Sequence, residues 1–407
     1  MSFFDTPNLG CRARSAWYNT TIEGGAAKAV SFSLLKPPRM LENFKGALAY
    51  QHIKELMALG HIREGQEENL QPSSIDLSIS GEIYRMRGTF LPRPGEKIRD
   101  ILKNGILFPV SLNQPLELNG IYLIRLNELL DLPENVYATT NNKSSSGRIN
   151  LQTRLIVNGV SSFDYVPKGY RGELWLEVIP KSFPVQLNYS ERLNQMRFMT
   201  GDGRLTDNDL HAGHDLHGFL RGSMNEVLPI DPSPLQRGLT MSIDLSSSDI
   251  VGYHCTPTNS RVLDFKGRDH RPDEFFEPIH KPHDGQLIMR RGEFYIFVTK
   301  EGIRVPREYA VEMLPYDVSK GEFRSHYAGF FDPGWGFGAN GEVLGTPAVL
   351  EIFTHDNDFV LRDGQPICQM VYEHLSAPAE LHYGDPKLVN NYYKQTGPRL
   401  SKHFKMN

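Results

Sequence analysis

The segment Ser74-Ile-Asp-Leu-Ser78 decides the fold, because the same five residues return at Ser242–Ser246. The two copies lie 168 residues apart (242 − 74). The pair Phe163-Asp164 recurs as Phe331-Asp332 with the same separation (332 − 164 = 168). A constant offset between ordered landmarks is typical of an internal repeat.

Two further landmarks extend the repeat. Leu176-Glu177-Val178 returns as Leu350-Glu351-Ile352, and Gln195-Met196 returns as Gln369-Met370. Both pairs are separated by 174 residues (351 − 177 and 369 − 195), so six residues (174 − 168) are inserted in the second copy. The chain is therefore predicted to be a tandem duplication.

A chain of 407 residues is long enough for two domains that each bury a core. The landmarks predict an irregular extension over residues 1–45, a first barrel over 46–199, a linker over 200–237 and a second barrel over 238–407. Short β-branched and aromatic runs between Gly and Pro turns, such as Phe294–Val298, favour a mainly β fold. A short helix is predicted over Ala47–Leu59, ending at Gly60.

The composition is that of an ordinary soluble protein. A hydrophobic content of 39% and a net charge of −4 give no support for a nucleic-acid or membrane-surface partner. The three cysteines, Cys11, Cys255 and Cys368, are distant and odd in number, which suits a reducing compartment. The first ten residues lack a signal-peptide pattern, so a cytoplasmic location is expected.

Lys143-Ser-Ser-Ser-Gly-Arg148 is the first candidate for chemistry. Consecutive hydroxyls, exposed backbone N–H groups and two flanking cations can bind an oxyanion, most commonly a phosphate. The alternative is an ordinary solvated serine-rich loop between two strands. We refer to residues 143–148 as the cradle.

Acidic residues form the second candidate. Strand alternation places Glu177 on the same face as Trp175, where partial desolvation would raise the carboxyl pKa toward neutrality and suit proton transfer. Asp164 precedes it, and Asp332 and Glu351 repeat the pair. A solvent-facing glutamate is the simpler alternative, but its recurrence in both copies argues against that reading.

Two other motifs are interpreted as structural. His211, His214 and His217 could ligate a metal on a helix, but Gly213 and Gly218 favour a loop. Gly336–Gly341 matches GxGxxG formally, yet Asn340-Gly341 is typical of a hairpin and no amphipathic helix is predicted after it.

Taken in order, these motifs resemble those of the dCTP deaminase/dUTPase superfamily, and the whole chain is similar to the two-repeat form of dCTP deaminases. The matching segments are Leu70–Leu77, Lys143–Arg148, Phe163-Asp164, Gly169–Gly172 with Glu177, Phe331–Trp335 with Glu351, and the tail Tyr393–Lys402. The resemblance implies a distorted, jelly-roll-like β-barrel. It also implies a homo-oligomer, a trimer or a multiple of one, with sites between barrels.

These motifs are compatible with two reactions, deamination and diphosphate release. Glu177 stands where deaminases of the family carry their catalytic glutamate and dUTPases carry an apolar residue. The tail resembles that of a deaminase, whereas Tyr170-Arg171-Gly172 is typical of dUTPases. A dUTP diphosphatase and a bifunctional enzyme are the alternatives, and a non-catalytic deoxynucleotide sensor is a third.

The resemblance also implies roles for individual residues. Glu177 would activate the water that attacks cytosine, Ser144 and Arg148 would orient water and base, and Asp164 would bind the 3′-hydroxyl of the sugar. The remaining substrate-binding residues implied for dCTP or dUTP are Lys143, Ser145, Tyr170, Asp332, Lys394, Gln395, Arg399 and Lys402. Mg²⁺ would arrive on the triphosphate, and no zinc would be needed, because the Pro-Cys-x-x-Cys signature of zinc deaminases is missing from the sequence.

The second copy departs from the first at Pro315–Lys320, where the serine-rich cradle should recur. Two arrangements follow. Either first-repeat barrels of different chains complete each other with Glu177, or the first-repeat cradle faces Asp332 and Glu351. On the sequence we favour the first, because Glu177 shares a repeat with the intact cradle.

Overall fold

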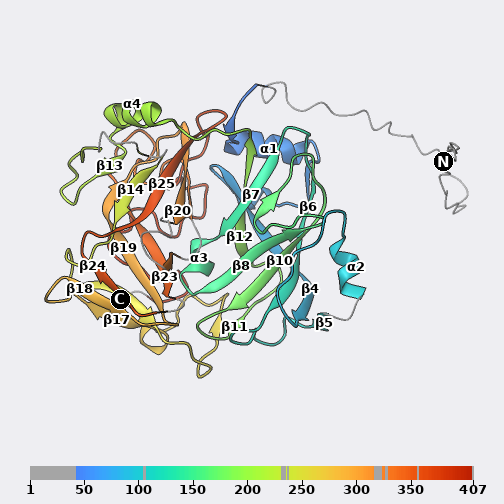
Figure 1. Cartoon of the computed structure of the whole chain (residues 1–407). Coiled ribbons are helices and arrows are strands. Elements are labelled where there is room, and N and C mark those ends of the chain that lie inside the picture. The colour runs from blue at the N-terminus through green and yellow to red at the C-terminus, as the bar shows by residue number, and fades with distance from the viewer. Residues whose placement is uncertain are drawn as a thin grey trace, which may run out of the picture. The chain divides into compact units, whose positions relative to one another are not determined.

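The structure, a computed structural model, describes residues 43–103, 107–230, 235, 238–315, 323–325, 329–354 and 357–405 (Figure 1). These residues belong to one compact unit of the chain, and most of its regular structure is β-strand, as predicted. The expected extension up to residue 42, Cys11 and the second-copy segment 316–320 lie outside the described residues.

Eleven strands from the first half form one antiparallel sheet that curls into a barrel. Seven of them follow the order β8-β10-β6-β4-β12-β7-β9, and the other four pair with parts of β4, β6 or β12. Their bounds are β1 Gly46–Ala47, β2 Ile62–Arg63, β3 Leu70–Gln71, β4 Ser74–Met86, β5 Leu107–Val110, β6 Tyr122–Asp131, β7 Tyr137–Asn142, β8 Leu151–Val157, β9 Tyr165–Val166, β10 Arg171–Pro180 and β12 Arg192–Thr200.

Strands of the second half form three further sheets. The largest has the order β17-β15-β19-β23-β21 with β13 at its side, the next has β14-β25-β20-β22, and the last pairs β18 with β24. Their bounds are β13 Leu220–Arg221, β14 Leu239–Ser242, β15 Ile250–Cys255, β17 Glu277–His280, β18 Gln286–Met289, β19 Phe294–Ile303, β20 Tyr309–Pro315, β21 Phe323–Ser325, β22 Phe330–Phe331, β23 Thr346–Thr354, β24 Phe359–Arg362 and β25 Pro366–His374.

In both halves, the strand at or next to the first landmark pairs with the strand that carries the Gln-Met landmark, but in a different register. In the first half, Asp76 of β4 lies opposite Gln195 of β12. In the second half, Thr240 of β14 lies opposite Gln369 of β25. The duplication seen in the sequence therefore corresponds to the same strand pairing formed twice.

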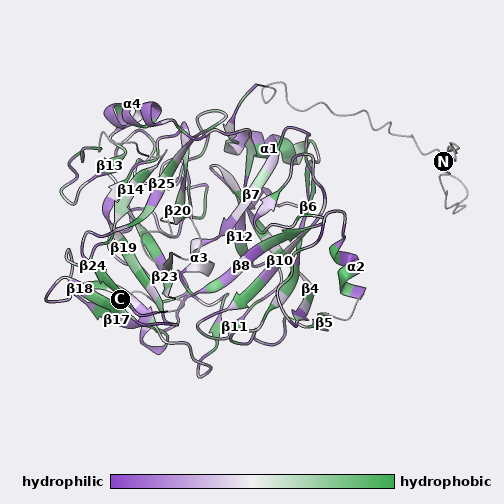
Figure 2. Ribbon diagram, viewed as in Figure 1, coloured by the Kyte–Doolittle hydropathy of each residue, from purple (hydrophilic) through white to green (hydrophobic). Residues whose placement is uncertain are grey.

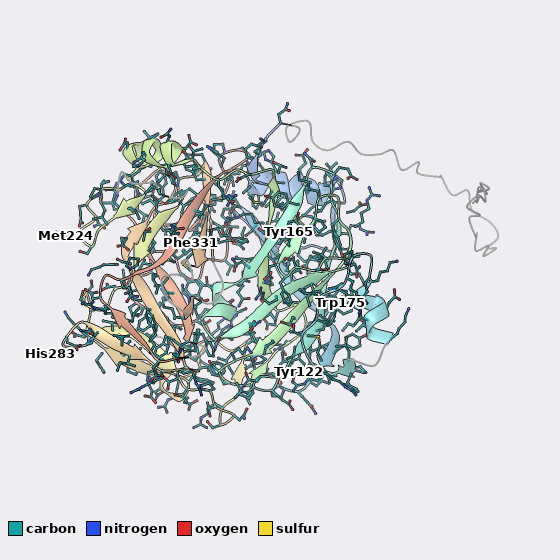
Figure 3. All side chains as sticks on the ribbon, viewed as in Figure 1. Tyr122, Tyr165, Trp175, Met224, His283 and Phe331 are labelled. Atoms are coloured by element: carbon teal, nitrogen blue, oxygen red, sulfur yellow. The ribbon has the colours of Figure 1, made fainter. Side chains whose placement is uncertain are left out.

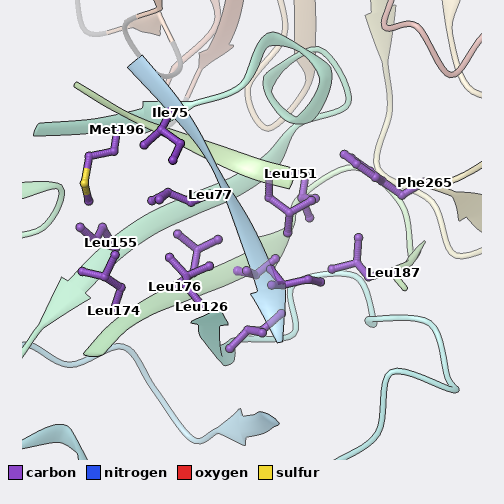
Figure 4. Packing of buried hydrophobic residues seen from close by; sticks show 14 of the residues in the cluster. Ile75, Leu77, Leu126, Leu151, Leu155, Leu174, Leu176, Leu187, Met196 and Phe265 are labelled. Atoms are coloured by element: carbon purple, nitrogen blue, oxygen red, sulfur yellow. The ribbon is translucent and has the colours of Figure 1, made fainter. Parts of the chain in front are cut away.

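Strand β10 shows how alternation builds the first core. Leu174 and Leu176 point into the main hydrophobic cluster (Figure 4), which also includes Val178, whereas Trp175 packs in a second cluster on the other face. Helix α2 (Ile98–Lys103) covers that second face through Ile98. Both faces of β10 are therefore buried, which removes the solvent-facing alternative for Glu177.

Helix α1 (Tyr50–Ala58) confirms the predicted helix, and it starts three residues later because the chain first pairs as β1. The loop prediction for the three histidines was wrong, because helix α4 (Asp207–His217) contains all of them. Thr206 and Asp209 form a capping box at its start, and Gly218 ends it in the left-handed conformation. Gly213 is accommodated within the helix because Phe219 packs directly against it.

The predicted hairpin at Asn340-Gly341 was also wrong. Residues 332–345 join β22 to β23 through turns and bends, and these two strands do not pair with each other. The Glu342 carboxylate closes the last turn by accepting the backbone N–H groups of Ala339 and Asn340.

The two halves are joined by backbone and side-chain contacts. Strand β11 (Val185–Gln186) pairs in parallel with β16 (Leu263–Asp264), and the backbone N–H of Ala49 donates to the Ser376 hydroxyl. Hydrophobic residues concentrate along the strands, and polar residues dominate α4 (Figure 2). The short helix α3 (Ser144–Gly147) lies between the sheets of the two halves (Figure 1).

Candidate active site

Helix α3 is formed by the cradle, in the turn from β7 to β8. The backbone N–H groups of Gly147 and Arg148 close one helical turn onto the carbonyls of Lys143 and Ser144. The Ser146 hydroxyl donates to the carbonyl of Leu193 on β12, at 2.9 Å. This anchor turns Ser144 toward the second half, where it lines the two clefts described below.

Arg148 is buried, and the C-terminal tail accepts hydrogen bonds from two of its guanidinium nitrogens. Its Nη1 donates to the backbone carbonyl of Arg399 and its Nη2 to the side-chain oxygen of Gln395, both at 3.0 Å. The guanidinium also lies over the Tyr392 ring, 3.8 Å from its centre. Burial lowers the pKa of Arg148, and the nearby Glu351 carboxylate opposes that effect. The cradle and the tail therefore form one unit around a buried cation.

Glu351 of β23 approaches the same unit from the second half. Its side chain is only 8% exposed, and it lies opposite Ile296 of β19. A β-carbon added to Gly147 would stand 2.0 Å from the Glu351 carboxylate oxygen. The carboxylate therefore rests directly against the glycine of the cradle, in space that any side chain would fill.

Burial raises the pKa of the Glu351 carboxyl to about 8, with the Arg148 charge acting in the opposite direction. Among the described residues, no hydrogen-bond donor to this carboxylate is found. A carboxyl group with this pKa changes protonation state near neutral pH and can both accept and return a proton.

Asp332 follows β22 and is also buried in the second half. The hydroxyl of Ser73 donates to its Oδ1 at 2.6 Å. Burial raises the pKa of Asp332, while the Arg197 charge and the Ser73 hydrogen bond act to lower it. Phe331, which Figure 3 places among the strands of the second half, packs edge-on against Trp335 beside it.

Two narrow clefts meet at Ser144. The first leads to Glu351 and is lined by Asn142, Ser144, Arg148, Met313, Gly329, Phe330, Phe331, Trp335, Val349 and Glu351. The second leads past Asp332 and is lined by Gln71, Lys143, Ser144, Ser145, Gln195, Phe330, Asp332, Trp335, Tyr383, Val389, Asn391 and Tyr392. Both clefts contain aromatic rings and one carboxylate, and the second also contains the Lys143 ammonium and the Ser145 hydroxyl.

Several cations lie close to one another around Lys143 of the cradle. Lys143 forms an ion pair with Asp76. Burial, followed by the neighbouring charges of Lys143 and Arg268, lowers the pKa of Lys402 to about 8. Repulsion among these cations would be relieved by a bound polyanion.

The first-repeat carboxylates lie elsewhere. Glu177 accepts a hydrogen bond from Thr89, and Asp164 accepts from Arg154 at 2.7 Å and from Thr140 at 3.1 Å. Burial raises the pKa of both carboxyl groups. Partners within the first repeat thus already occupy these carboxylates, and neither lines the clefts at the cradle.

The structure therefore brings together only part of the predicted set. Lys143, Ser144, Ser145, Arg148, Asp332, Glu351, Gln395, the Arg399 carbonyl and Lys402 meet around the cradle. Glu177, Asp164 and Tyr170 do not, and the Tyr170 hydroxyl instead donates to the carbonyl of Glu173. The Lys394 ammonium lies over the Tyr393 ring, 5.2 Å from its centre.

Several residues at the site were missed in the sequence. The Tyr392 ring lies under Arg148, the Ser401 hydroxyl donates to the Ser145 carbonyl of the cradle, and the Ser73 hydroxyl donates to Asp332. None of these three residues belongs to a repeated landmark. Asp76 and Gln195 do belong to repeated landmarks, which was the available signal for them.

Within the described ranges, no group of three or more His, Cys, Asp or Glu side chains is placed to hold a metal. Within α4, His217 contacts Glu308 at 3.1 Å and stacks on Phe219, and the His214 ring packs edge-on against Phe219. No helix in the described part of the chain has the length and apolar character needed to cross a membrane.

Comparison with known proteins identifies the class and then the family. A solved structure described as 2′-deoxycytidine 5′-triphosphate deaminase from Agrobacterium tumefaciens superposes with a TM-score of 0.76 and 35% identity, covering 83% of this chain and 97% of that one. The fold is thus that of the dUTPase-like nucleotide enzymes. The family descriptions "2'-deoxycytidine 5'-triphosphate deaminase (DCD) N-terminal domain" and "C-terminal domain" match residues 44–202 and 210–404. The chain belongs to the dCTP deaminase family.

Curated relatives agree at modest identity. A protein named "dCTP deaminase, dUMP-forming" from Methanobrevibacter smithii is 30% identical over 131 residues, 32% of this chain and 63% of that relative, slightly less than two thirds. A protein of the same name from Methanosphaera stadtmanae is 28% identical over 177 residues, 42% of this chain and 84% of the relative.

Proposed function

We propose that this chain deaminates dCTP hydrolytically and that Glu351, not Glu177, is its catalytic base. The observation that carries this assignment is the contact of the Glu351 carboxylate with Gly147 of the cradle, beside Arg148. It favours the second of the two arrangements considered from the sequence, in which the first-repeat cradle meets the second-repeat carboxylates. Membership of the dCTP deaminase family supports the choice of substrate.

The proposed reaction needs one proton carrier. Glu351 takes a proton from a water molecule whose oxygen bonds to C4 of the cytosine. Glu351 passes this proton to N3, then takes the second proton from the new C4 hydroxyl group and gives it to the amino group, and the C4–N4 bond breaks to release ammonia as the C4 carbonyl forms. Since burial raises the pKa of Glu351 to about 8, both protonation states are available near neutral pH.

Arg148 and Ser144 would orient the water and the base in the cleft that ends at Glu351. Asp332 would bind the 3′-hydroxyl of the deoxyribose, which places the sugar in the second cleft. Lys143, Ser145 and Lys402 would bind the triphosphate, with Mg²⁺ arriving on the nucleotide as part of the substrate. The uracil nucleotide so formed would feed dUMP and dTTP synthesis.

The decisive comparison is between two matched substitutions. Glu351→Gln is expected to lower the rate of ammonia release from dCTP by about a thousandfold, because it removes the proton carrier. Glu177→Gln, the same change at the repeated position, is expected to leave the rate within about twofold of the wild type. Measuring ammonia from pure protein with dCTP and Mg²⁺ tests both.

A loss of ammonia release in Glu177→Gln, with Glu351→Gln close to the wild type, would return the catalytic role to Glu177.

The pH dependence of the rate is a second test of the assignment to Glu351. Because Glu351 must be ionised to accept the first proton, the wild-type rate should rise as the pH increases toward about 8. Nucleotide binding without any ammonia release would instead favour the sensor hypothesis.

A second candidate function is the direct conversion of dCTP to dUMP. It is favoured by the relatives named "dCTP deaminase, dUMP-forming". Against it, Tyr170-Arg171-Gly172, the segment typical of dUTPases, lies in the first repeat, and Tyr170 lines neither cleft at the cradle. Product analysis decides the question, since dUTP with ammonia supports simple deamination, whereas dUMP with pyrophosphate supports the combined reaction.

A further inference from the structure

A chain of hydrogen bonds runs from the first repeat to Asp332. Arg197 of β12 donates from Nη2 to the hydroxyl oxygen of Ser73 at 3.2 Å. The same hydroxyl donates its proton to Oδ1 of Asp332 at 2.6 Å. Ser73 is fully buried, so this carboxylate oxygen receives its bond from a hydroxyl held inside the protein.

Arg197 is itself held by several groups of the second repeat. Its side chain has no exposed surface, and its Nη1 donates to the Val311 carbonyl of β20 at 3.2 Å. Its guanidinium lies 4.1 Å from the centre of the Phe330 ring, and Nη1 is 3.6 Å from a carboxylate oxygen of Glu373. A first-repeat cation is thus clamped by second-repeat groups, and it fixes where Ser73 points.

The two repeats differ at these two positions. By the repeat offsets, Ser73 corresponds to Met241 (73 + 168) and Arg197 corresponds to Val371 (197 + 174). Both counterparts are apolar, as expected for buried strand positions. At these two positions, the first repeat therefore has a buried serine and a buried arginine where the second repeat has apolar residues.

The first-repeat aspartate is held differently. Asp164 receives its bonds from Arg154, Thr140 and the backbone N–H of Leu155, all in its own repeat. The Ser73–Arg197 pair is thus not a general support for this aspartate in both copies.

We propose that Ser73 and Arg197 are positioning residues that aim the Asp332 carboxylate at the 3′-hydroxyl of the deoxyribose. They thereby set the preference for nucleotides that carry this hydroxyl. The inference rests on the proposed function, in which Asp332 meets the sugar. It extends that function by assigning substrate discrimination to two residues of the opposite repeat that do not touch the substrate.

The test compares dCTP with 2′,3′-dideoxy-CTP, which lacks only the 3′-hydroxyl. Ser73→Ala should lower kcat/KM for dCTP by about tenfold, because Asp332 loses its hydroxyl partner, while the value for the dideoxy analogue changes less than about twofold. Ser73→Thr, which keeps a hydroxyl, should restore much of the preference. The matched control is Ser80→Ala, which removes a buried hydroxyl whose one hydrogen bond among the described residues is accepted from the backbone N–H of Glu82.

Arg197→Lys provides an independent arm, since it keeps the charge but loses the fork that reaches both Ser73 and Val311. Like Ser73→Ala, it should lower the ratio of kcat/KM for dCTP to kcat/KM for the dideoxy analogue. An unchanged ratio in both variants, with thermal midpoints close to the wild type, would overturn the inference.

Calorimetric binding of both nucleotides to the wild type separates this inference from the proposed function. If dCTP is neither bound nor deaminated by the wild type, the proposed function fails. If dCTP is turned over and the ratio does not respond to Ser73 or Arg197, only the positioning role fails.

Discussion

At the scale of single residues, duplication has placed the same glutamate in two different surroundings. Burial raises the pKa of both Glu177 and Glu351. Thr89 occupies the first carboxylate with a hydrogen bond, whereas the second lies against the bare α-carbon of Gly147. The chemistry is therefore decided by what each carboxylate faces, since the two side chains are identical.

Gly147→Ala tests this contact directly. The added methyl group would need the space of the Glu351 carboxylate, so it should displace the carboxylate and lower kcat for dCTP by about a hundredfold. The control is Gly81→Ala, because a β-carbon at Gly81 meets nothing within 4 Å and should leave kcat unchanged. A Gly147→Ala enzyme with wild-type kcat would separate Glu351 from the chemistry.

At the scale of elements, a four-residue helix and the C-terminal tail depend on each other. Helix α3 is too short to be stable alone, so its conformation requires tertiary contacts. The tail provides them through Gln395, the Arg399 carbonyl and the Ser401 hydroxyl, which donates to the Ser145 carbonyl at 2.9 Å. The tail is thus part of the site wall, joined to the cradle by Arg148.

Tyr392→Leu removes the ring beneath Arg148 and leaves the hydrogen bonds of its guanidinium in place. Losing a buried cation–π contact should raise KM for dCTP by about tenfold through a looser cradle. Tyr189→Leu is a suitable control, because Tyr189 is 66% exposed and its hydroxyl donates to Asn127, outside the clefts at the cradle. Steady-state kinetics on the two variants would show equal KM values if the ring under Arg148 has no role.

At the scale of the whole molecule, the fold assembles one set of complementary groups from two repeats. The cradle comes from the first half, and Asp332 and Glu351 come from the second. The expected trimer is therefore not required to complete this site, although the assembly state stays a prediction. In the first repeat, Asp164 and Glu177 instead accept hydrogen bonds from Arg154 and Thr89 of the same repeat.

This asymmetry predicts one nucleotide per chain. Titration of the Glu351→Gln variant with dCTP, in which turnover is suppressed, should give a calorimetric stoichiometry of about one. Two equivalent sites per chain would mean that Glu177 also meets a cradle, as in the arrangement with first-repeat barrels of different chains. Repeating the titration with a Glu177→Gln, Glu351→Gln double variant shows whether Glu177 affects binding at all.

The duplication, the mainly β fold and the hydroxyl and cationic residues that line the clefts at the cradle could be predicted from the sequence. Each depends on local order: landmarks at a fixed offset, strand-length apolar runs, and hydroxyls between two cations at residues 143–148. The N-terminal helix is similarly local, since its apolar spacing and its stop at Gly60 lie within a few turns. The error at α4 has the same origin, because Gly213 and Gly218 were both interpreted as breaks although only Gly218 ends the helix.

Only the tertiary structure decided which glutamate meets the cradle. Gly147 and Glu351 are 204 residues apart (351 − 147), and no local pattern encodes their contact. The same holds for Ser73 and Arg197, whose role depends on a carboxylate in the other repeat. Glu177 shares a repeat with the cradle and is near it along the chain, whereas the packing of one half against the other determines which groups are near in space.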